Sequence, residues 1–100
     1  MRHYNHLNLL IEAPELPATK LETLCYSYMF LGCTKLSEVT MLATDASASN
    51  CLLGWLQNAG TEAGSRKLTL ANDGIYNALS GESNYLPDIW KSGQAEIIYK

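Results

Sequence analysis

The sequence is poor in charge, and its basic residues form no cluster. Only 17% of its 100 residues are charged, and seven Lys and Arg stand against ten Asp and Glu, which gives a formal net charge of -3. This share of charged residues is too low for a coiled coil, and the 47% of hydrophobic residues is too high for a disordered chain. Because no basic stripe is present, nucleic acid and anionic membranes are poor partners.

Long apolar runs are also missing, since none approaches the roughly 20 residues that a membrane helix needs. We therefore predict no membrane insertion. The opening stretch MRHYNHLNLLIEAPEL is interrupted by polar residues and a proline before an apolar region develops, so it does not form a signal peptide. A chain of 100 residues is expected to form a single domain.

Residues for catalysis or cofactor binding are scarce. The three cysteines are too few for a disulfide framework or a four-ligand zinc site. His3 and His6 have the spacing of two metal ligands on a helix, but no third ligand follows at a fixed distance. They are also the only bases that could activate a cysteine, and no glycine-rich phosphate loop is present. We predict no enzyme activity, no metal and no cofactor.

Two parts of the chain resemble each other at an offset of 26 residues. They read LIEAPELPATKLETLCYSYMFLGC and LSEVTMLATDASASNCLLGWLQNA, so that Leu10 falls on Leu36 and Cys25 on Cys51. Several apolar positions match, among them Leu16 with Leu42 and Met29 with Trp55. A period between about 20 and 50 residues is typical of stacked repeat units.

The pattern of residues in each copy predicts a strand, a turn and a helix. Thr19 and Glu22 have the spacing of a capping box, which predicts a helix that begins at Lys20 and ends at Gly32. In the second copy Ser47 or Ser49 can cap a helix, apolar residues from Ala48 to Leu56 have the same spacing, and Gly60 ends the unit. Residues 36–42 alternate as a half-buried strand does. The fold class is therefore predicted as α/β, a short leucine-rich-repeat solenoid with a period of about 26.

The period is lost from Arg66 onward. Residues 67–71 predict a strand, 72–74 a turn, 75–79 one helical turn, 85–90 a short amphipathic turn and 95–99 a final strand. An open solenoid end exposes its core, so a distinct cap is expected there. We assign residues 1–61 to the repeat coils and 62–100 to a C-terminal capping segment of one continuous domain.

The stretch MFLGCTKL, preceded by APELPAT, resembles the repeat of the bacterial BspA-like leucine-rich-repeat surface proteins. The resemblance is close over residues 7–56 and loose over 57–100. It implies a cell-surface or secreted protein that adheres to host proteins or to other bacteria. It also implies that this chain is the C-terminal end of a longer repeat array, or a truncated relative of one.

Two functions are consistent with these features of the sequence. The favoured one is a non-enzymatic binding module whose strand face presents Glu38, Thr40, Lys67 and Thr69 to a protein or glycan ligand. The alternative is a purely structural fragment that caps a longer array. Glu12 and Glu38 also recur at the repeat offset, and exposed charge on a binding face is favoured over a catalytic pair.

The repeat also predicts which strands are neighbours and which side chains are buried. The strands around Val39 and over residues 67–70 should be adjacent and parallel. Tyr28 should lie in the core, Tyr26 should be exposed, Trp90 should seal the cap and Cys33 should pack inward. Cys25 and Cys51 should be neighbours, either as buried thiols, which we favour, or as a disulfide. Residues predicted to be buried are Leu24, Cys25, Met29, Leu36, Val39, Cys51, Trp55 and Leu56, and those predicted to be exposed are Glu22, Lys35 and Glu38.

The N-terminal side is predicted to lack a cap. The apolar residues assigned to the first coil are Leu7, Leu9, Leu10, Ile11 and Ala13, and the preceding stretch MRHYNH is too short and too polar to cover them. An exposed apolar patch with unpaired strand edges promotes self-association. We therefore expect the chain to dimerise through this face, to aggregate at high concentration, or to gain stability when upstream repeats are restored.

Overall fold

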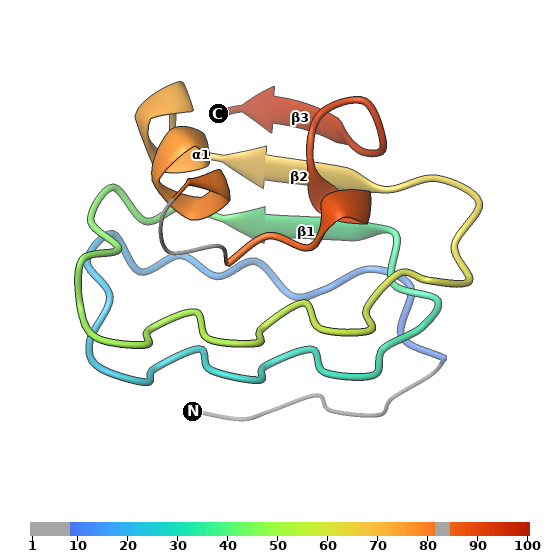
Figure 1. Ribbon diagram of the computed structural model, residues 1–100, viewed down its shortest axis with the longest axis horizontal. Coiled ribbons are helices and arrows are strands. Elements are labelled where there is room, and N and C mark those ends of the chain that lie inside the picture. The colour runs from blue at the N-terminus through green and yellow to red at the C-terminus, as the bar shows by residue number, and fades with distance from the viewer. Residues whose placement is uncertain (1–8, 82–84) are drawn as a thin grey trace.

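The computed structural model describes residues 9–81 and 85–100. Within these residues the chain forms strands β1 (Glu38–Met41), β2 (Lys67–Leu70) and β3 (Glu96–Tyr99). Helix α1 (Asp73–Ser80) and the 3-10 helix η1 (Asp88–Trp90) lie between β2 and β3 in the chain. The strands form one parallel sheet in the order β1-β2-β3 (Figure 1).

The sheet has a buried face and an open face because its strands alternate between apolar and polar residues. Val39 pairs with Leu68, which pairs in turn with Ile97, and the side chains of Val39 and Leu68 are buried. The predicted parallel pairing of the strand around Val39 with residues 67–70 is confirmed.

The similarity between the two copies corresponds to physical contact. Glu12 and Leu16 form parallel bridges to β1, and the following residues run beside the second copy (Figure 1). The amide of Tyr26 donates to the carbonyl of Cys51, and the amide of Phe30 donates to that of Trp55, both at 2.9 Å. Matching positions of the two copies are therefore neighbours in space.

The predicted solenoid of strand, turn and helix coils is wrong. Among the described residues neither copy contains a helix, and residues 23–32 and 49–58 are continuous runs of turns. The structure is instead a small α/β fold with three parallel strands and one α-helix in its described part.

Backbone geometry explains why the two helices do not form. Positive φ recurs every four residues, at Leu24, Tyr28 and Gly32 in the first copy. It recurs in the second copy at Asn50, Gly54 and Asn58. A right-handed helix cannot continue through a left-handed residue. Amide groups alternate instead between the carbonyl three residues back and the neighbouring copy, as Ser27 and Tyr26 do.

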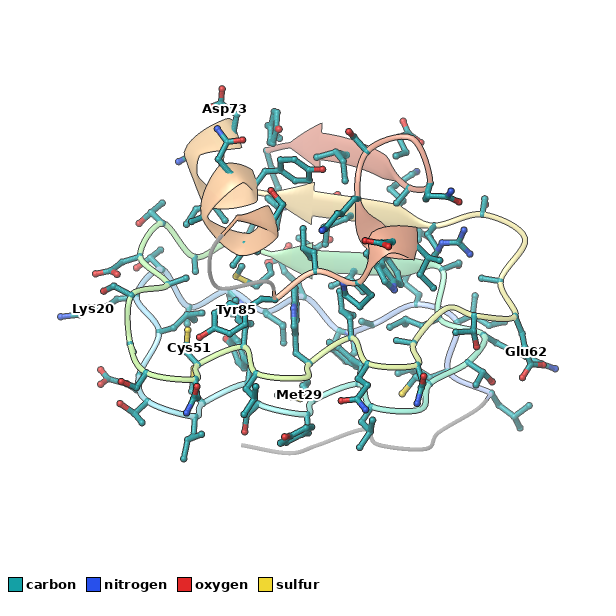
Figure 2. The ribbon with its side chains drawn as sticks, viewed as in Figure 1. Lys20, Met29, Cys51, Glu62, Asp73 and Tyr85 are labelled. Atoms are coloured by element: carbon teal, nitrogen blue, oxygen red, sulfur yellow. The ribbon has the colours of Figure 1, made fainter. Side chains whose placement is uncertain are left out.

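The burial predictions succeed where they do not depend on the helices. Met29, Leu36, Val39, Cys51, Trp55 and Leu56 are buried as predicted, and so is Cys33. Glu22 and Lys35 are exposed, whereas Glu38 is half-buried. Side chains at the rim, such as Lys20, Glu62 and Asp73, point away from the body of the molecule (Figure 2).

Several burial predictions are wrong because they assumed a helical stripe. Leu24 is 51% exposed and Tyr28 is 40% exposed, and both have positive φ. Cys25 is half-buried rather than buried. Tyr26 was expected at the surface, yet it is only 1% exposed. In the run of turns, burial follows the turn geometry and not a period of 3.6.

The C-terminal segment is attached to the core by two tryptophans. Trp90 is fully buried, as its predicted sealing role requires, and its Nε1 donates to the carbonyl of Ala59 at 2.9 Å. The indole of Trp55 donates to the carbonyl of Tyr85, also at 2.9 Å. Each bond satisfies an indole that would otherwise be buried without a partner.

Helix α1 begins earlier than predicted. Asn72 is its N-cap, since its Oδ1 accepts a hydrogen bond from the amide of Ile75 at 3.0 Å. The tight turn predicted over residues 72–74 is thus the first turn of the helix. Ile75 and Leu79 bury one side of α1 in the core.

Candidate functional site

The open face of the sheet carries two rows of side chains in register. Glu38, Lys67 and Glu96 form the first row, because they are partners across the three strands. The second row, one step further along the strands, consists of Thr40, Thr69 and Ile98. We call these six residues the outer face. The four residues that the sequence predicted for ligand binding all belong to it.

The first row is extended and acidic. Glu12 lies beside Glu38 through a parallel bridge, as the repeat offset predicted. Three carboxylates therefore share the row with one ammonium group, which is a formal charge of -2. Lys67 Nζ lies 3.9 Å from Glu38 Oε1, and both side chains are more than 40% exposed. Such an exposed pair is weak, so the carboxylate oxygens remain available to accept hydrogen bonds.

A polar hollow of about 510 Å³ opens where the strands begin. Ser37 and Ser65 line it together with Gln94, and Glu38, Lys67 and Glu96 connect it to the outer face. A binding pocket for a small molecule is usually enclosed and mostly apolar. This hollow is open and polar, which suits a hydrated ligand lying across the surface.

Arg66 lines this hollow and holds the surrounding loops in place by hydrogen bonds to their backbone. Its Nε donates to the carbonyl of Ile89 at 2.8 Å, and its Nη1 donates to those of Gly60 at 2.9 Å and Ala63 at 3.2 Å. Nη2 reaches the carbonyl of Gln94 at 3.4 Å. The guanidinium is thus occupied by backbone groups and positions the loops around the hollow.

Sequence reasoning missed part of this site. Residues 95–99 were correctly predicted as a strand, but they were assigned to a cap and not to the continuation of the sheet. Glu96 was therefore not included in the ligand face. The polar Glu96 between the apolar residues Ala95 and Ile97 was the available signal. The loops that supply Ser65 and Gln94 carry no comparable pattern.

The described residues contain no group of three or more His, Cys, Asp or Glu side chains placed to hold a metal ion. His3 and His6 lie outside the residues that the structure describes. No helix in the described ranges is long and apolar enough to cross a membrane.

All three cysteines lie in the described residues, and none of them forms a disulfide. Cys25 is half-buried, whereas Cys33 and Cys51 are buried. Burial raises the pKa of the Cys51 thiol, and the neighbouring Cys25 raises it further. Both effects disfavour the reactive thiolate at Cys51.

We expect a maleimide reagent to modify Cys25 before Cys51 in the native protein, because Cys51 is inaccessible and resists deprotonation. Peptide mass spectrometry over a time course would measure both rates. Denatured protein is the control, and there the two thiols should react at similar rates. Equal rates in the native protein would contradict the burial of Cys51.

Comparison of the chain with protein-family models, with curated proteins and with solved structures gave no match. The resemblance to bacterial surface proteins therefore stays a prediction, and the function is argued from the residues of the outer face and the polar hollow.

Proposed function

We propose that the protein is a non-enzymatic binding module whose outer face binds a basic segment of a protein ligand. The observation that carries this proposal is the first row together with the adjoining Glu12, because these four residues place three carboxylates beside one ammonium group. Such a row attracts lysine and arginine side chains and repels acidic surfaces.

The shape of the site supports an extended ligand. The three strands present one continuous face, and Thr40 and Thr69 add hydroxyl groups that can donate and accept hydrogen bonds. The polar hollow continues the surface beyond the strand ends. Because the carboxylates project from hydrogen-bonded strands, binding does not require the ordering of a loop.

The proposed location is the cell surface or the extracellular space, with adhesion as the biological role. Its support is the resemblance of residues 7–56 to bacterial surface proteins. A purely structural role is the alternative, and a binding experiment separates the two.

We expect a labelled peptide of alternating lysine and serine to bind the protein in fluorescence anisotropy at low salt. Glu12→Gln and Glu38→Gln should each weaken binding about two- to fivefold, because each removes one exposed charge interaction of about 0.5–1 kcal/mol. Lys67→Gln should strengthen binding, because it removes a repulsive ammonium group. Glu22→Gln is the matched control, since Glu22 is exposed but lies outside the outer face.

A matched peptide of alternating glutamate and serine should not bind. Failure of the lysine peptide to bind would contradict the proposal and favour a structural role. An equal effect of Glu22→Gln would show that net charge and not the outer face attracts the peptide. Binding of a neutral glucose oligosaccharide in place of the lysine peptide would assign a glycan ligand and overturn the protein assignment.

A further inference from the structure

Strand β3 leaves one of its edges without a partner among the described residues. Its other edge pairs with β2, where the amide of Glu96 donates to the carbonyl of Arg66 at 2.8 Å and the amide of Lys100 donates to that of Leu70 at 2.9 Å. In a parallel ladder, alternate residues bond to the neighbouring strand. The backbone groups of Ile97 and Tyr99 therefore point away from the sheet, ready to pair with another strand.

The side chains at this edge favour pairing. Tyr99 is 48% exposed, and Ile97 and Ile98 are half-buried. Edge strands are commonly protected by proline or by a central charge, and β3 has neither. Its charges stand only at the two ends, with Glu96 at the beginning and Lys100 directly after the last strand residue.

We propose that β3 pairs antiparallel with β3 of a second copy of this chain, with Ile98 opposite its own equivalent. In this register Ile97 faces Tyr99 of the second copy. These are the residues with outward backbone groups, so each such pair can exchange two hydrogen bonds. Glu96 then lies opposite Lys100 of the second copy, and the symmetry repeats this ion pair at the other end.

The charges select this register over its neighbours. A shift that keeps the same backbone groups outward moves the pairing by two residues and places either Glu96 or Lys100 opposite Ile98. Both ion pairs are then lost. A parallel pairing of the two β3 edges near register would place Glu96 beside Glu96 and Lys100 beside Lys100, so like charges would face each other. The antiparallel register is thus the one that satisfies the backbone and both charges in a closed dimer.

Lys100 already has a partner within the chain. Its Nζ lies 3.1 Å from Glu15 Oε1, but the Lys100 side chain is 60% exposed. Glu15 lies beyond β1, next to the bridge of Leu16 to Met41, so Lys100 must leave this ion pair to reach Glu96 of the second copy. Such an exposed pair is weak, so its loss costs little.

The dimer has a consequence for the outer face. Because the two-fold axis of an antiparallel pair is perpendicular to the sheet, the outer faces of both copies lie on the same side of one continuous sheet. The pairing itself does not depend on ligand binding.

Sedimentation equilibrium at protein concentrations from low micromolar to millimolar should show a reversible equilibrium between monomer and dimer. Glu96→Lys and Lys100→Glu should each raise the dissociation constant about tenfold or more, because each turns two attractive pairs into repulsive ones. The double variant should recover the original association. An equimolar mixture of the two single variants should form a mixed dimer, because every facing pair is then of opposite charge.

Ile11→Lys tests the other candidate interface. Ile11 is 59% exposed and precedes Glu12, which forms a bridge to β1 at the other edge of the sheet. The sequence predicts self-association through this N-terminal side. We expect this variant to dimerise like the parent. A monomeric parent, unchanged association of both charge variants, or loss of dimer in Ile11→Lys would each overturn the proposal. These measurements contain no ligand, so their failure is distinct from a failure of peptide binding.

Discussion

Replacing Trp90 with alanine should lower the free energy of unfolding by about 3–5 kcal/mol, the usual cost of removing a large buried aromatic side chain. Trp90 is fully buried, and its indole packs close to Gly60, where an added Cβ would lie 2.9 Å from the ring. The substitution opens a cavity and leaves the carbonyl of Ala59 without the indole donor. Both losses occur where η1 meets the rest of the core.

Denaturant unfolding of the parent and variant would measure this change. Trp90→Phe should cost less, since it keeps much of the volume and loses mainly the hydrogen bond. Leu53→Ala is the surface control, because Leu53 is 37% exposed. A loss below about 1 kcal/mol for Trp90→Ala would show that the C-terminal segment is not held by this residue.

The three strands were predictable because their signal is local. In β1 and β2, polar and apolar residues alternate over a few positions, and this alternation fixes which side chains face the core. Glu38, Thr40, Lys67 and Thr69 could therefore be assigned to one face before their neighbours were known. The expectation that stacked repeat units follow one another without reversal added that neighbouring strands run parallel.

The runs of turns were not predictable from the same local rules. Leu21, Leu24 and Cys25 have helical spacing, but the hydrogen bonds that replace the helix run to residues about 25 positions away. Leu24 and Tyr28 give no sign in the sequence of their positive φ. Asn50, Gly54 and Asn58 do give one, because asparagine and glycine tolerate that geometry and recur every four residues.

The polar hollow could not be predicted from the sequence for a similar reason. Ser65 and Gln94 reach the polar hollow from two loops that are far apart in the sequence. The two loops are held together by Arg66, which contacts four backbone carbonyls. No local sequence pattern indicates these contacts. A residue that joins distant loops is recognised only when those loops are placed.

Replacing Arg66 with methionine should lower the free energy of unfolding by about 2–4 kcal/mol. Methionine keeps the length of the apolar stem but removes every donor to the carbonyls of Gly60, Ala63, Ile89 and Gln94. A hydrogen bond from a charged donor contributes about 1.5–3 kcal/mol, and water can replace part of this at a half-buried residue.

Denaturant unfolding again measures the change, and Lys67→Met is the matched control because the Lys67 side chain is 44% exposed and faces outward. The control should change stability by less than about 0.5 kcal/mol. Arg66→Lys should recover little, because an ammonium group cannot reach several separated carbonyls as the planar guanidinium does. A full recovery by lysine would show that charge alone, and not the geometry of the donors, matters at this position.

The same variant connects stability to the proposed site. Arg66 precedes β2 and holds the loop that contains Gln94. Glu38 stands on β1 and Glu12 forms a bridge to it, and neither belongs to the loops that Arg66 holds. At a temperature where Arg66→Met is still folded, hydrogen exchange should rise first around residues 89–95. Peptide binding should then weaken through the polar hollow, even though the first row of the outer face is unchanged. Binding equal to that of the parent would restrict the ligand to the strands and exclude the hollow from the site.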